Sequence, residues 1–337
     1  MPASPTPAVV AVVVAYNRRD LLLEALDALE AQTLAPAAIV VVDNASTDGS
    51  GDAVAAAHPH VDLVRLERNT GGAGGFAVGL ARALCDHPAD WVWLMDDDTI
   101  PTPSALAELV AGAAGDDAVV LAGSRVEWTD GSEHPMNTPR RKPFVRAAER
   151  RAAESRGVLA VRSSSFVSML VRADAVAEHG LPVADYFIWN DDFEFSTRLL
   201  RGRRGVFVPR SVVVHKTKVL GATDLDPGPR FYYEVRNKLW MLRRSRSLAP
   251  AEKVLYFGST LRRWLRTFAR SGDRAVLRDG LRRGLRDGLR TGPRSNTDVL
   301  DGLGSATESV ARAERGNVAA AGGGERRRGG ARDGSAR

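Results

Sequence analysis

The sequence predicts an α/β fold in which a doubly wound, mostly parallel sheet is flanked by helices and followed by a C-terminal helical segment. Between residues 9 and 95, short β-branched runs alternate with segments in which leucine and alanine recur at helical spacing. The runs are apolar throughout, which is typical of strands buried on both faces, as a parallel sheet requires. Polar residues gather where these runs end, the edge at which such sheets bind ligands.

The elements up to residue 95 follow one another in strict alternation. The run Val9 to Ala15 predicts a buried strand, and leucines at 22, 26 and 29 predict the helix after it, with Asn17 as its N-cap. The elements expected next are a strand Ile39 to Val42, a helix Asp52 to Ala57, a strand Val61 to Leu66, a helix Phe76 to Leu84 and a strand Trp91 to Met95. Four strands joined by helical crossovers form a doubly wound sheet.

The second half of the chain is less regular. We expect strands near Val119 to Ala122, Phe166 to Val171, Val206 to Val208 and Val212 to Val214, and a helix from Asp191 to Arg201. The predicted division is a catalytic domain over residues 1–225, a basic amphipathic helical segment over 226–290 and a disordered tail over 291–337. The tail is assigned as disordered because Gly, Ala, Arg and Ser dominate it and leave little to bury.

Composition excludes several classes of protein. With 337 residues and 44% hydrophobic content, the chain can form a large buried core. The single cysteine, Cys85, excludes an internal disulfide framework and a Cys-based zinc cage. No apolar run reaches the length of a membrane span, and the first residues lack the features of a secretion signal, so we expect a cytoplasmic location.

Charge is concentrated in one segment. Residues 231–290 carry 16 Lys and Arg against 5 Asp and Glu, and aromatic residues and leucines are interleaved with the arginines. This pattern predicts a helical platform on an anionic membrane surface, at the inner face of the plasma membrane. The alternative is packing against the catalytic domain, and both can hold at once. No RNA- or DNA-binding motif accompanies the basic stretch, so no nucleic-acid partner is predicted.

The acidic triplet Asp96-Asp97-Asp98 follows a buried strand directly. Three adjacent carboxylates repel one another, and a divalent cation that bridges a diphosphate is the usual reason to tolerate that repulsion. Side chains two apart in an extended segment share a face, so Asp96 and Asp98 can address one ligand while Asp97 points away. The alternative is a solvated acidic turn.

Two other strand ends indicate a nucleotide. Asp43 can accept hydrogen bonds from a ribose hydroxyl or a base, or it can cap the turn that follows. The stretch from Asn69 to Gly79 is rich in glycine, and the helix expected after it offers its positive end to a phosphate. A dinucleotide fingerprint follows the first strand of its fold, whereas this loop follows the third, so a nicotinamide cofactor is not indicated.

A later acidic group begins the helix expected at residue 191. Asp191, Asp192 and Glu194 lie there beside aromatic residues that include Trp189. Such a carboxylate pair is suited to holding a sugar ring and removing a proton from its hydroxyl, although acidic residues also stabilise helix N-termini without a catalytic role. His215, at the end of a short strand, is either structural or a metal ligand.

In this order the motifs resemble those of glycosyltransferase family 2, whose members adopt the Rossmann-like GT-A fold; the resemblance covers about residues 8–240. It implies that the AYNR and DNAS segments bind the nucleotide of a UDP-sugar donor, that the acidic triplet holds Mn²⁺ or Mg²⁺, and that the later acidic pair contains the base of an inverting transfer. The residues it implies for the nucleotide sugar are Tyr16, Asn17, Asp43, Asn69, Gly71, Gly72, Asp96 and Asp97, and those for the acceptor or sugar are Trp189 and Glu194.

More narrowly, GGAGGFAVG, WVWLMDDD, WNDDFEF and the strand-end histidine are similar to actinobacterial galactofuranosyltransferases, which use UDP-galactofuranose to build cell-wall galactan. That similarity implies Asp96, Asp98 and His215 as metal ligands, Asp192 as the base with Asp191 as the first substitute, and a glycan or polyprenyl-linked acceptor in cell-envelope synthesis. The alternatives are a rhamnosyl or other hexosyl transferase of this fold, and a nucleotidyltransferase that acts on sugar phosphates.

Overall fold

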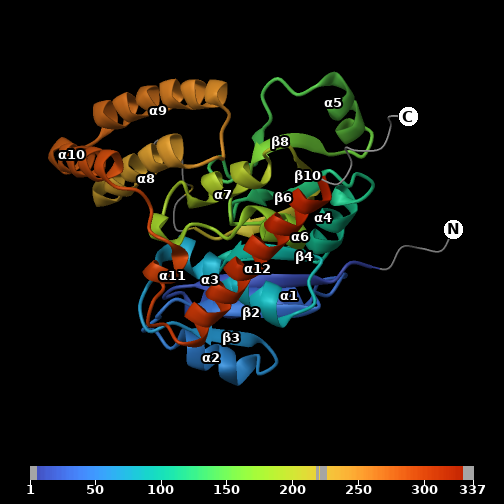
Figure 1. The fold of residues 1–337 in the computed structure, drawn as a ribbon. Coiled ribbons are helices and arrows are strands. Elements are labelled where there is room, and N and C mark those ends of the chain that lie inside the picture. The colour runs from blue at the N-terminus through green and yellow to red at the C-terminus, as the bar shows by residue number, and fades with distance from the viewer. Residues whose placement is uncertain (1–5, 218–219, 221–225, 329–337) are drawn as a thin grey trace, which may run out of the picture.

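The computed structural model describes residues 6–217, 220 and 226–328 (Figure 1). One ten-stranded sheet has the order β3-β2-β1-β4-β9-β6-β10-β8-β7, and β5 pairs with β10. The strands are β1 Val9–Ala15, β2 Ala38–Asp43, β3 Asp62–Arg65, β4 Trp91–Asp96, β5 Thr99–Pro101, β6 Val119–Glu127, β7 Arg140–Arg141, β8 Leu159–Ser163, β9 Met169–Arg172 and β10 Arg204–His215. The helices are α1 Arg19–Glu30, α2 Ser50–Ala57, α3 Gly71–Asp86, α4 Ala105–Ala113, α5 Ala147–Glu154, α6 Ala173–His179, α7 Asp191–Leu199, α8 Phe231–Arg244, α9 Pro250–Arg270, α10 Arg274–Arg290, α11 Asn296–Val299 and α12 Ser305–Arg328.

The parallel half of the sheet contains β3, β2, β1 and β4. Every residue of β1 is buried, and its side chains alternate between two cores. Val10, Val12 and Val14 pack on the side of α3, whereas Val9 and Val13 pack on the side of α1 and α4. Helices therefore cover both faces, and the predicted doubly wound α/β fold is confirmed.

The other half of the sheet is mixed. β9 lies antiparallel between β4 and β6, whereas β6 and β10 are parallel. The two strands expected near residues 206–208 and 212–214 form a single strand, β10, whose register shifts between Val208 and Val212. Pro209 lies within this irregularity, which is a place where a sheet tolerates proline.

Strand register brings the polar strand ends to one edge. Ala15 of β1 pairs with Asp43 of β2, and the preceding residue, Val14, pairs with Asp96 of β4. β5 then turns back beside β10, so that Thr99 pairs with His215. Residues that are far apart in the sequence thus meet at the carboxyl ends of the parallel strands.

The glycine-rich stretch differs from its prediction, because α3 begins at Gly71 rather than near Phe76. Two of the glycines, Gly75 and Gly79, pack the helix against the sheet. A Cβ at Gly75 would lie 2.5 Å from Val14, and one at Gly79 would lie 2.4 Å from Val12. Absence of side chains at these positions allows helix and sheet to approach closely, so a phosphate-binding loop is not needed to explain the glycines.

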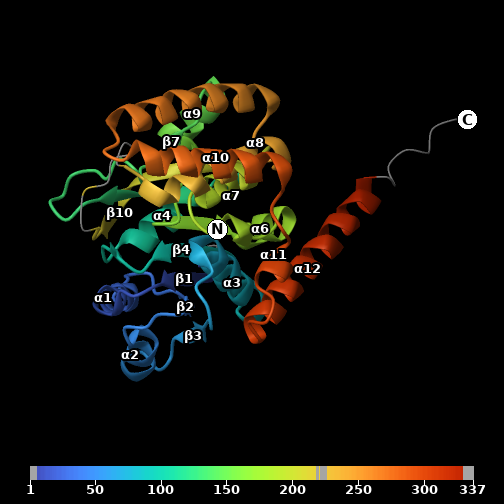
Figure 2. The ribbon, with the colours of Figure 1, turned by 90° about the vertical axis from the view of Figure 1, so that its left-hand side faces the viewer.

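Helices α8, α9 and α10 form a layer at the end of the molecule opposite α2 (Figure 2). Phe231 and Val235 of α8 share a small core with Trp264 of α9 and Leu277 of α10. Glycines at 280, 284 and 288 recur every fourth residue along α10 and bring it into close contact with α8. The predicted boundary at residue 225 itself lies outside the described residues.

Residues 295–316 contradict the predicted disordered tail. Leu300, Leu303 and Val310 are buried in the core that contains α3, and Figure 2 shows the first part of α12 beside that helix. Asn296 fixes the chain before α12, because its side chain donates to the carbonyl of Pro182 and accepts from the N–H of Ala184. Because apolar residues are sparse in this segment, its composition alone did not reveal these buried positions. Residues 329–337 lie outside the described residues.

We predict that Leu300→Ala lowers the free energy of unfolding by about 2–5 kcal/mol, because it opens a cavity at a fully buried position. Urea unfolding followed by circular dichroism measures the effect. Leu289→Ala is the matched control, since Leu289 is 51% exposed and should change stability little. Equal stability of the two variants would show that α11 and α12 do not pack on the domain.

Candidate active site

Three side chains that can bind a metal meet at the strand-end edge. Asp96 ends β4, Asp98 precedes β5, and His215 ends β10; each offers an atom within 4.8 Å of the other two. The pairing of β5 with β10 creates this contact across more than 100 residues of sequence. The Nδ1 atom of His215 lies 3.2 Å from Oδ1 of Asn137, which can orient the ring as outer partners of metal-bound histidines do.

The middle residue of the triplet has a different role. Asp97 accepts a hydrogen bond of 2.8 Å from the N–H of Tyr16 and lies 3.4 Å from Arg18. Arg18 also pairs with Asp98. Asp97 therefore joins the ends of β1 and β4, while Asp96 and Asp98 form the group that contains His215.

Proximity and burial change the acidity of these carboxylates. Burial, and then repulsion from Asp98, raise the pKa of Asp96 to about 6. Burial raises the pKa of Asp97 to about 7. Burial acts in the same direction on Asp98, but the adjacent His215 ring together with Arg18 outweighs it, so the pKa of Asp98 lies below its usual value. Burial is thus the largest cost of ionising Asp96 and Asp97, and repulsion from Asp98 adds to it at Asp96.

Most of the residues predicted to bind the nucleotide at the other strand ends form hydrogen bonds within the loops there. Asp43 is buried, and its Oδ1 accepts from the N–H of Ser46, as in the turn-capping alternative. Asn17 has a φ of 54° and accepts from the N–H of Thr47, so it links two strand-end loops and does not cap α1. Asn69 accepts from the N–H of Gly71 at the start of α3. The ring of Tyr16 is 45% exposed and free to contact a ligand.

A cavity of about 400 Å³ adjoins the candidate metal ligands. Asp96, Gly72, Trp189, Asp191 and Asp192 all line it. Gly71 does not line it: a Cβ there would lie 2.1 Å from the carbonyl oxygen of Phe187, so glycine allows two backbone segments to meet. Gly72 thus borders the cavity and Gly71 packs against Phe187, and a ligand contact of either glycine stays a prediction.

The segment before the acidic pair has an unusual backbone. Phe187, Trp189 and Asn190 have φ values of 63°, 70° and 64°. A non-glycine residue in this region costs about 1–3 kcal/mol, so surrounding contacts must hold it. The Nδ2 atom of Asn237 in α8 lies 2.8–2.9 Å from the carbonyl oxygens of residues 186, 188 and 189, and Glu234 accepts from Asn190 at 2.8 Å. The C-terminal helices thus fix the loop that presents the acidic pair.

The two carboxylates of the pair have different environments. Asp191 is 7% exposed and lies beside Gly72 at the start of α3; burial and then repulsion from Asp192 raise its pKa well above the usual value. Asp192 is more exposed to the cavity, and burial raises its pKa while Arg140 and Lys238 lower it. Asp192 is therefore the member of the pair whose raised pKa is partly offset by cationic groups of the cavity.

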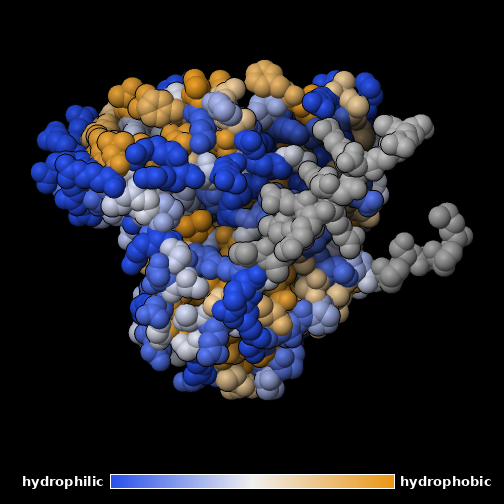
Figure 3. Space-filling view, in the orientation of Figure 1, coloured by the Kyte–Doolittle hydropathy of each residue, from blue (hydrophilic) through white to orange (hydrophobic). Residues whose placement is uncertain are grey.

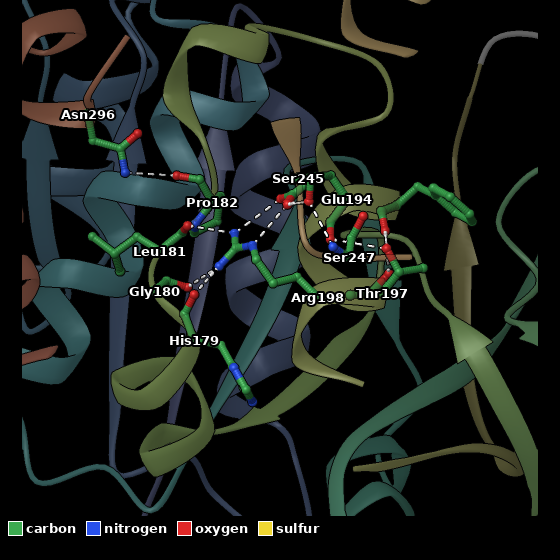
Figure 4. Close-up of polar contacts among 12 residues, drawn as sticks. His179, Gly180, Leu181, Pro182, Glu194, Thr197, Arg198, Ser245, Ser247 and Asn296 are labelled. Atoms are coloured by element: carbon green, nitrogen blue, oxygen red, sulfur yellow. Dashed lines mark hydrogen bonds and ion pairs between the residues drawn. The ribbon is translucent and has the colours of Figure 1, made fainter. Parts of the chain in front are cut away.

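Glu194 lies outside the cavity, which contradicts its predicted contact with a sugar. Figure 4 shows its carboxylate against the guanidinium of Arg198, at 2.9 Å, and the hydroxyl of Ser245 donates to it at 2.6 Å. Arg198 also donates to the carbonyls of residues 179–181. Because Glu194 follows Asp192 by two helical residues, its side chain leaves the helix on a different face, where it stabilises the fold.

Several cavity residues were missed by the sequence analysis. Arg140, Lys238 and Arg263 place cations in the cavity wall, and burial lowers the pKa of Lys238 to about 8. Arg140 belongs to β7, a strand of two residues that no periodicity reveals. Arg18 was included in the AYNR motif without a role. The position of Arg18, shortly after the buried strand Val9–Ala15, was the available sign that its side chain lies at the strand-end edge.

The sheet, the acidic strand ends and the adjoining cavity define the chain as a glycosyltransferase of the GT-A fold. Residues 10–175 match the family model Glycosyl transferase family 2. The chain belongs to glycosyltransferase family 2, and this assignment decides against a nucleotidyltransferase.

The curated relatives of this chain include galactofuranosyltransferases. Galactofuranosyltransferase GlfT1 of Mycobacterium tuberculosis (strain H37Rv) is 37% identical over 205 residues, and GlfT1 of Mycolicibacterium smegmatis is 33% identical over 202 residues. Each match includes 58% of this chain and 66% of the relative. The chain thus spans just under two thirds of the length of these relatives.

Solved structures share the fold. Staphylococcus aureus TarS 1-349 in complex with UDP-GlcNAc has a TM-score of 0.59 and 17% identity, covering 94% of this chain and 92% of that chain. GalNAc-T7 with UDP, GalNAc and Mn²⁺ has a TM-score of 0.56 and 17% identity, covering 90% of this chain and 58% of that one. At this identity the likeness extends to the fold alone.

We predict that Asp191→Asn stabilises the metal-free fold at pH 8 but not at pH 4. The pKa of Asp191 is raised on folding, so the folded state holds its proton more tightly than the unfolded state. Its ionisation therefore destabilises the fold as pH rises above the unfolded value of about 4, and below that value both states are protonated. Urea unfolding in EDTA at the two pH values measures the difference.

The control is Asp20→Asn, because the Asp20 side chain is 84% exposed. It should show no comparable dependence on pH. A loss of stability in Asp191→Asn at pH 8 would contradict the assignment of Asp191 as a destabilising buried carboxylate.

Proposed function

We propose that this chain is an inverting, metal-dependent transferase that moves galactofuranose from UDP-galactofuranose to a glycan or polyprenyl-linked acceptor in cell-envelope polysaccharide synthesis. The observation that carries the proposal is that Asp96 belongs both to the candidate metal group with Asp98 and His215 and to the wall of the cavity that Asp192 lines. The names of the GlfT1 relatives support the sugar. The UDP-GlcNAc complex of TarS supports a UDP-linked donor.

The donor set fits a divalent cation. Two carboxylates and an imidazole are ligands that Mn²⁺ accepts, and the two oxygen donors also suit Mg²⁺. Oδ1 of Asp98 is buried and 3.0 Å from Nε2 of His215, yet it receives no hydrogen bond of suitable geometry from the described residues. A bound cation would neutralise charge that develops on the leaving diphosphate.

Asp192 has the position of a general base. It lines the cavity together with Asp96, so an acceptor hydroxyl in this cavity can lie between the base and a donor sugar held at the metal ligands. In a single displacement at the anomeric carbon, Asp192 takes the proton of the attacking hydroxyl and the configuration inverts. Tyr16 and Asp43, at the ends of β1 and β2, are proposed to contact the nucleoside.

The donor assignment is tested by screening UDP-galactofuranose, UDP-galactopyranose, UDP-GlcNAc and dTDP-rhamnose with purified protein and reading nucleotide release. We expect UDP-galactofuranose to be used in Mn²⁺ or Mg²⁺ and turnover to vanish in EDTA, because Asp96, Asp98 and His215 converge on one cation site. Preference for dTDP-rhamnose would identify another hexosyl transferase of the same fold. Full turnover in EDTA would contradict metal dependence.

The base is tested with Asp192→Asn, which keeps the size of the side chain and removes its basicity. Transfer should fall by at least about 10²-fold, while UDP binding measured by calorimetry should persist. Asp191→Asn is the matched comparison, because it changes the neighbouring carboxylate. Near-normal transfer in Asp192→Asn with loss in Asp191→Asn would reassign the base to Asp191.

We also propose that α9 contacts an anionic membrane. Apolar side chains gather along the edge of the molecule formed by α9 (Figure 3). The exposed apolar residues of this helix are Val254, Leu255, Phe257, Leu261 and Leu265, with exposures of 42–73%. Arginines on the same helix can meet lipid phosphates while these side chains enter the headgroup region. No helix among the described residues is long and apolar enough to cross a membrane.

Vesicle co-sedimentation tests this surface. Binding to anionic vesicles should weaken as ionic strength rises, because each Lys or Arg near such a surface contributes about 1 kcal/mol. Leu255→Glu with Leu265→Glu should reduce binding further, whereas Leu289→Glu on α10 should not. Equal binding to neutral and anionic vesicles, or absence of binding to both, would remove the membrane role.

A further inference from the structure

A second cavity, which we call the arginine cavity, opens beside the catalytic one. It has a volume of about 310 Å³ and is lined by Pro135, Met136, Thr138, Arg140, Ser259, Arg262, Arg263 and Arg266. Met136, Arg140 and Arg263 line both cavities. Its walls therefore carry four guanidinium groups and no carboxylate, and it continues the space that contains Asp192.

Most of these guanidinium groups lack an anionic partner. Arg263 pairs with Glu234, but within the described part of the chain no carboxylate lies in ion-pair range of Arg140, Arg262 or Arg266. The arrangement is unlike that of α10, where Arg282, Arg283 and Arg286 each pair with an aspartate of the same helix. A solvated face accounts for α10, whereas Arg262 and Arg266 of α9 lie beside a cavity without a carboxylate partner among the described residues.

Arg140 links the positive charge of the arginine cavity to the candidate base, Asp192. Its guanidinium lies over the ring of Phe193, 5.3 Å from the centroid, and its charge lowers the pKa of Asp192. A group held by Arg140 therefore lies close to the candidate base. A ligand that spans both cavities can place an anionic group among the arginines and a hydroxyl beside Asp192.

We propose that the arginine cavity binds a phosphate or diphosphate ester carried by the acceptor. This inference rests on the proposed function and names the acceptor's chemical class. Guanidinium groups match phosphate oxygens through paired N–H donors. Three unpaired cations exceed the charge of one carboxylate but suit the two or three negative charges of a phosphate or diphosphate ester. The bound ester orients the acceptor so that its sugar hydroxyl reaches Asp192.

The test is calorimetric binding to the full chain in EDTA, where the probes cannot bind through a metal. The probes are octyl diphosphate, octyl phosphate, octanoate and 1-octanol. We expect octyl diphosphate to bind at least about tenfold more tightly than octanoate, with no measurable binding of 1-octanol. Arg262→Glu with Arg266→Glu should weaken binding of the diphosphate by at least about tenfold, since both guanidinium groups are replaced by anions.

The matched control is Arg278→Glu with Arg282→Glu, which changes the charge equally on α10 at residues that line neither cavity. It should leave diphosphate binding unchanged. If the glutamate pair on α9 does not fold, Arg262→Gln with Arg266→Gln replaces it, with a smaller loss expected. The test needs no turnover, so its failure is separate from failure of the proposed transfer reaction.

Three results would overturn the proposal. The first is equal binding of octanoate and octyl diphosphate, and the second is diphosphate binding that the α9 variants do not change. The third is loss of binding to anionic vesicles in the α9 variants while octyl diphosphate binding persists. That third result would make these arginines contacts for lipid headgroups rather than for the acceptor.

Discussion

Repulsion among carboxylates at the carboxyl ends of the strands is the constraint on which the rest of the site depends. Asp96, Asp97, Asp98, Asp191 and Asp192 lie around one edge of the sheet. Burial acts to raise the pKa of all five, although His215 and Arg18 outweigh it at Asp98. Cationic side chains from distant elements, namely Arg18, Arg140 and Lys238, lie near these carboxylates, and His215 contacts Asp98. The strand ends thus provide side chains that can hold a further cation, and Asp192 lies close to them as a carboxylate that can act as a base.

The C-terminal helices belong to this site as much as the sheet does. Asn237 and Glu234 hold the strained loop before the acidic pair, and Arg162 ties α7 to the start of α9 through Thr197 and Glu252. These contacts agree with the alternative given for the basic segment, namely that it packs against the catalytic domain. It leaves one face of α9 outward, so contact with the domain and contact with a membrane are compatible.

The parallel half of the fold could be predicted because a strand buried on both faces must be apolar throughout, as Val9 to Ala15 is. The acidic triplet and acidic pair could be located because each directly follows or begins an element. The sequence could not reveal Asn237 or Arg140, because their roles depend on contacts between distant segments. Glu194 was misplaced because adjacency in sequence does not show which helix face points to the cavity. The tail was misassigned because a few buried apolar residues suffice to hold it against the domain, namely Leu300, Leu303, Ala306, Val310 and Ala313.

Calorimetric binding of UDP to EDTA-treated protein, with and without added Mn²⁺, tests the proposed metal site most directly. If the carboxylates and His215 form a metal site for a diphosphate, UDP binds much more tightly with Mn²⁺, and His215→Ala removes that gain. His60→Ala, at a histidine whose side chain is 62% exposed, should keep it. Equal affinity for UDP in EDTA and in Mn²⁺ would contradict the account.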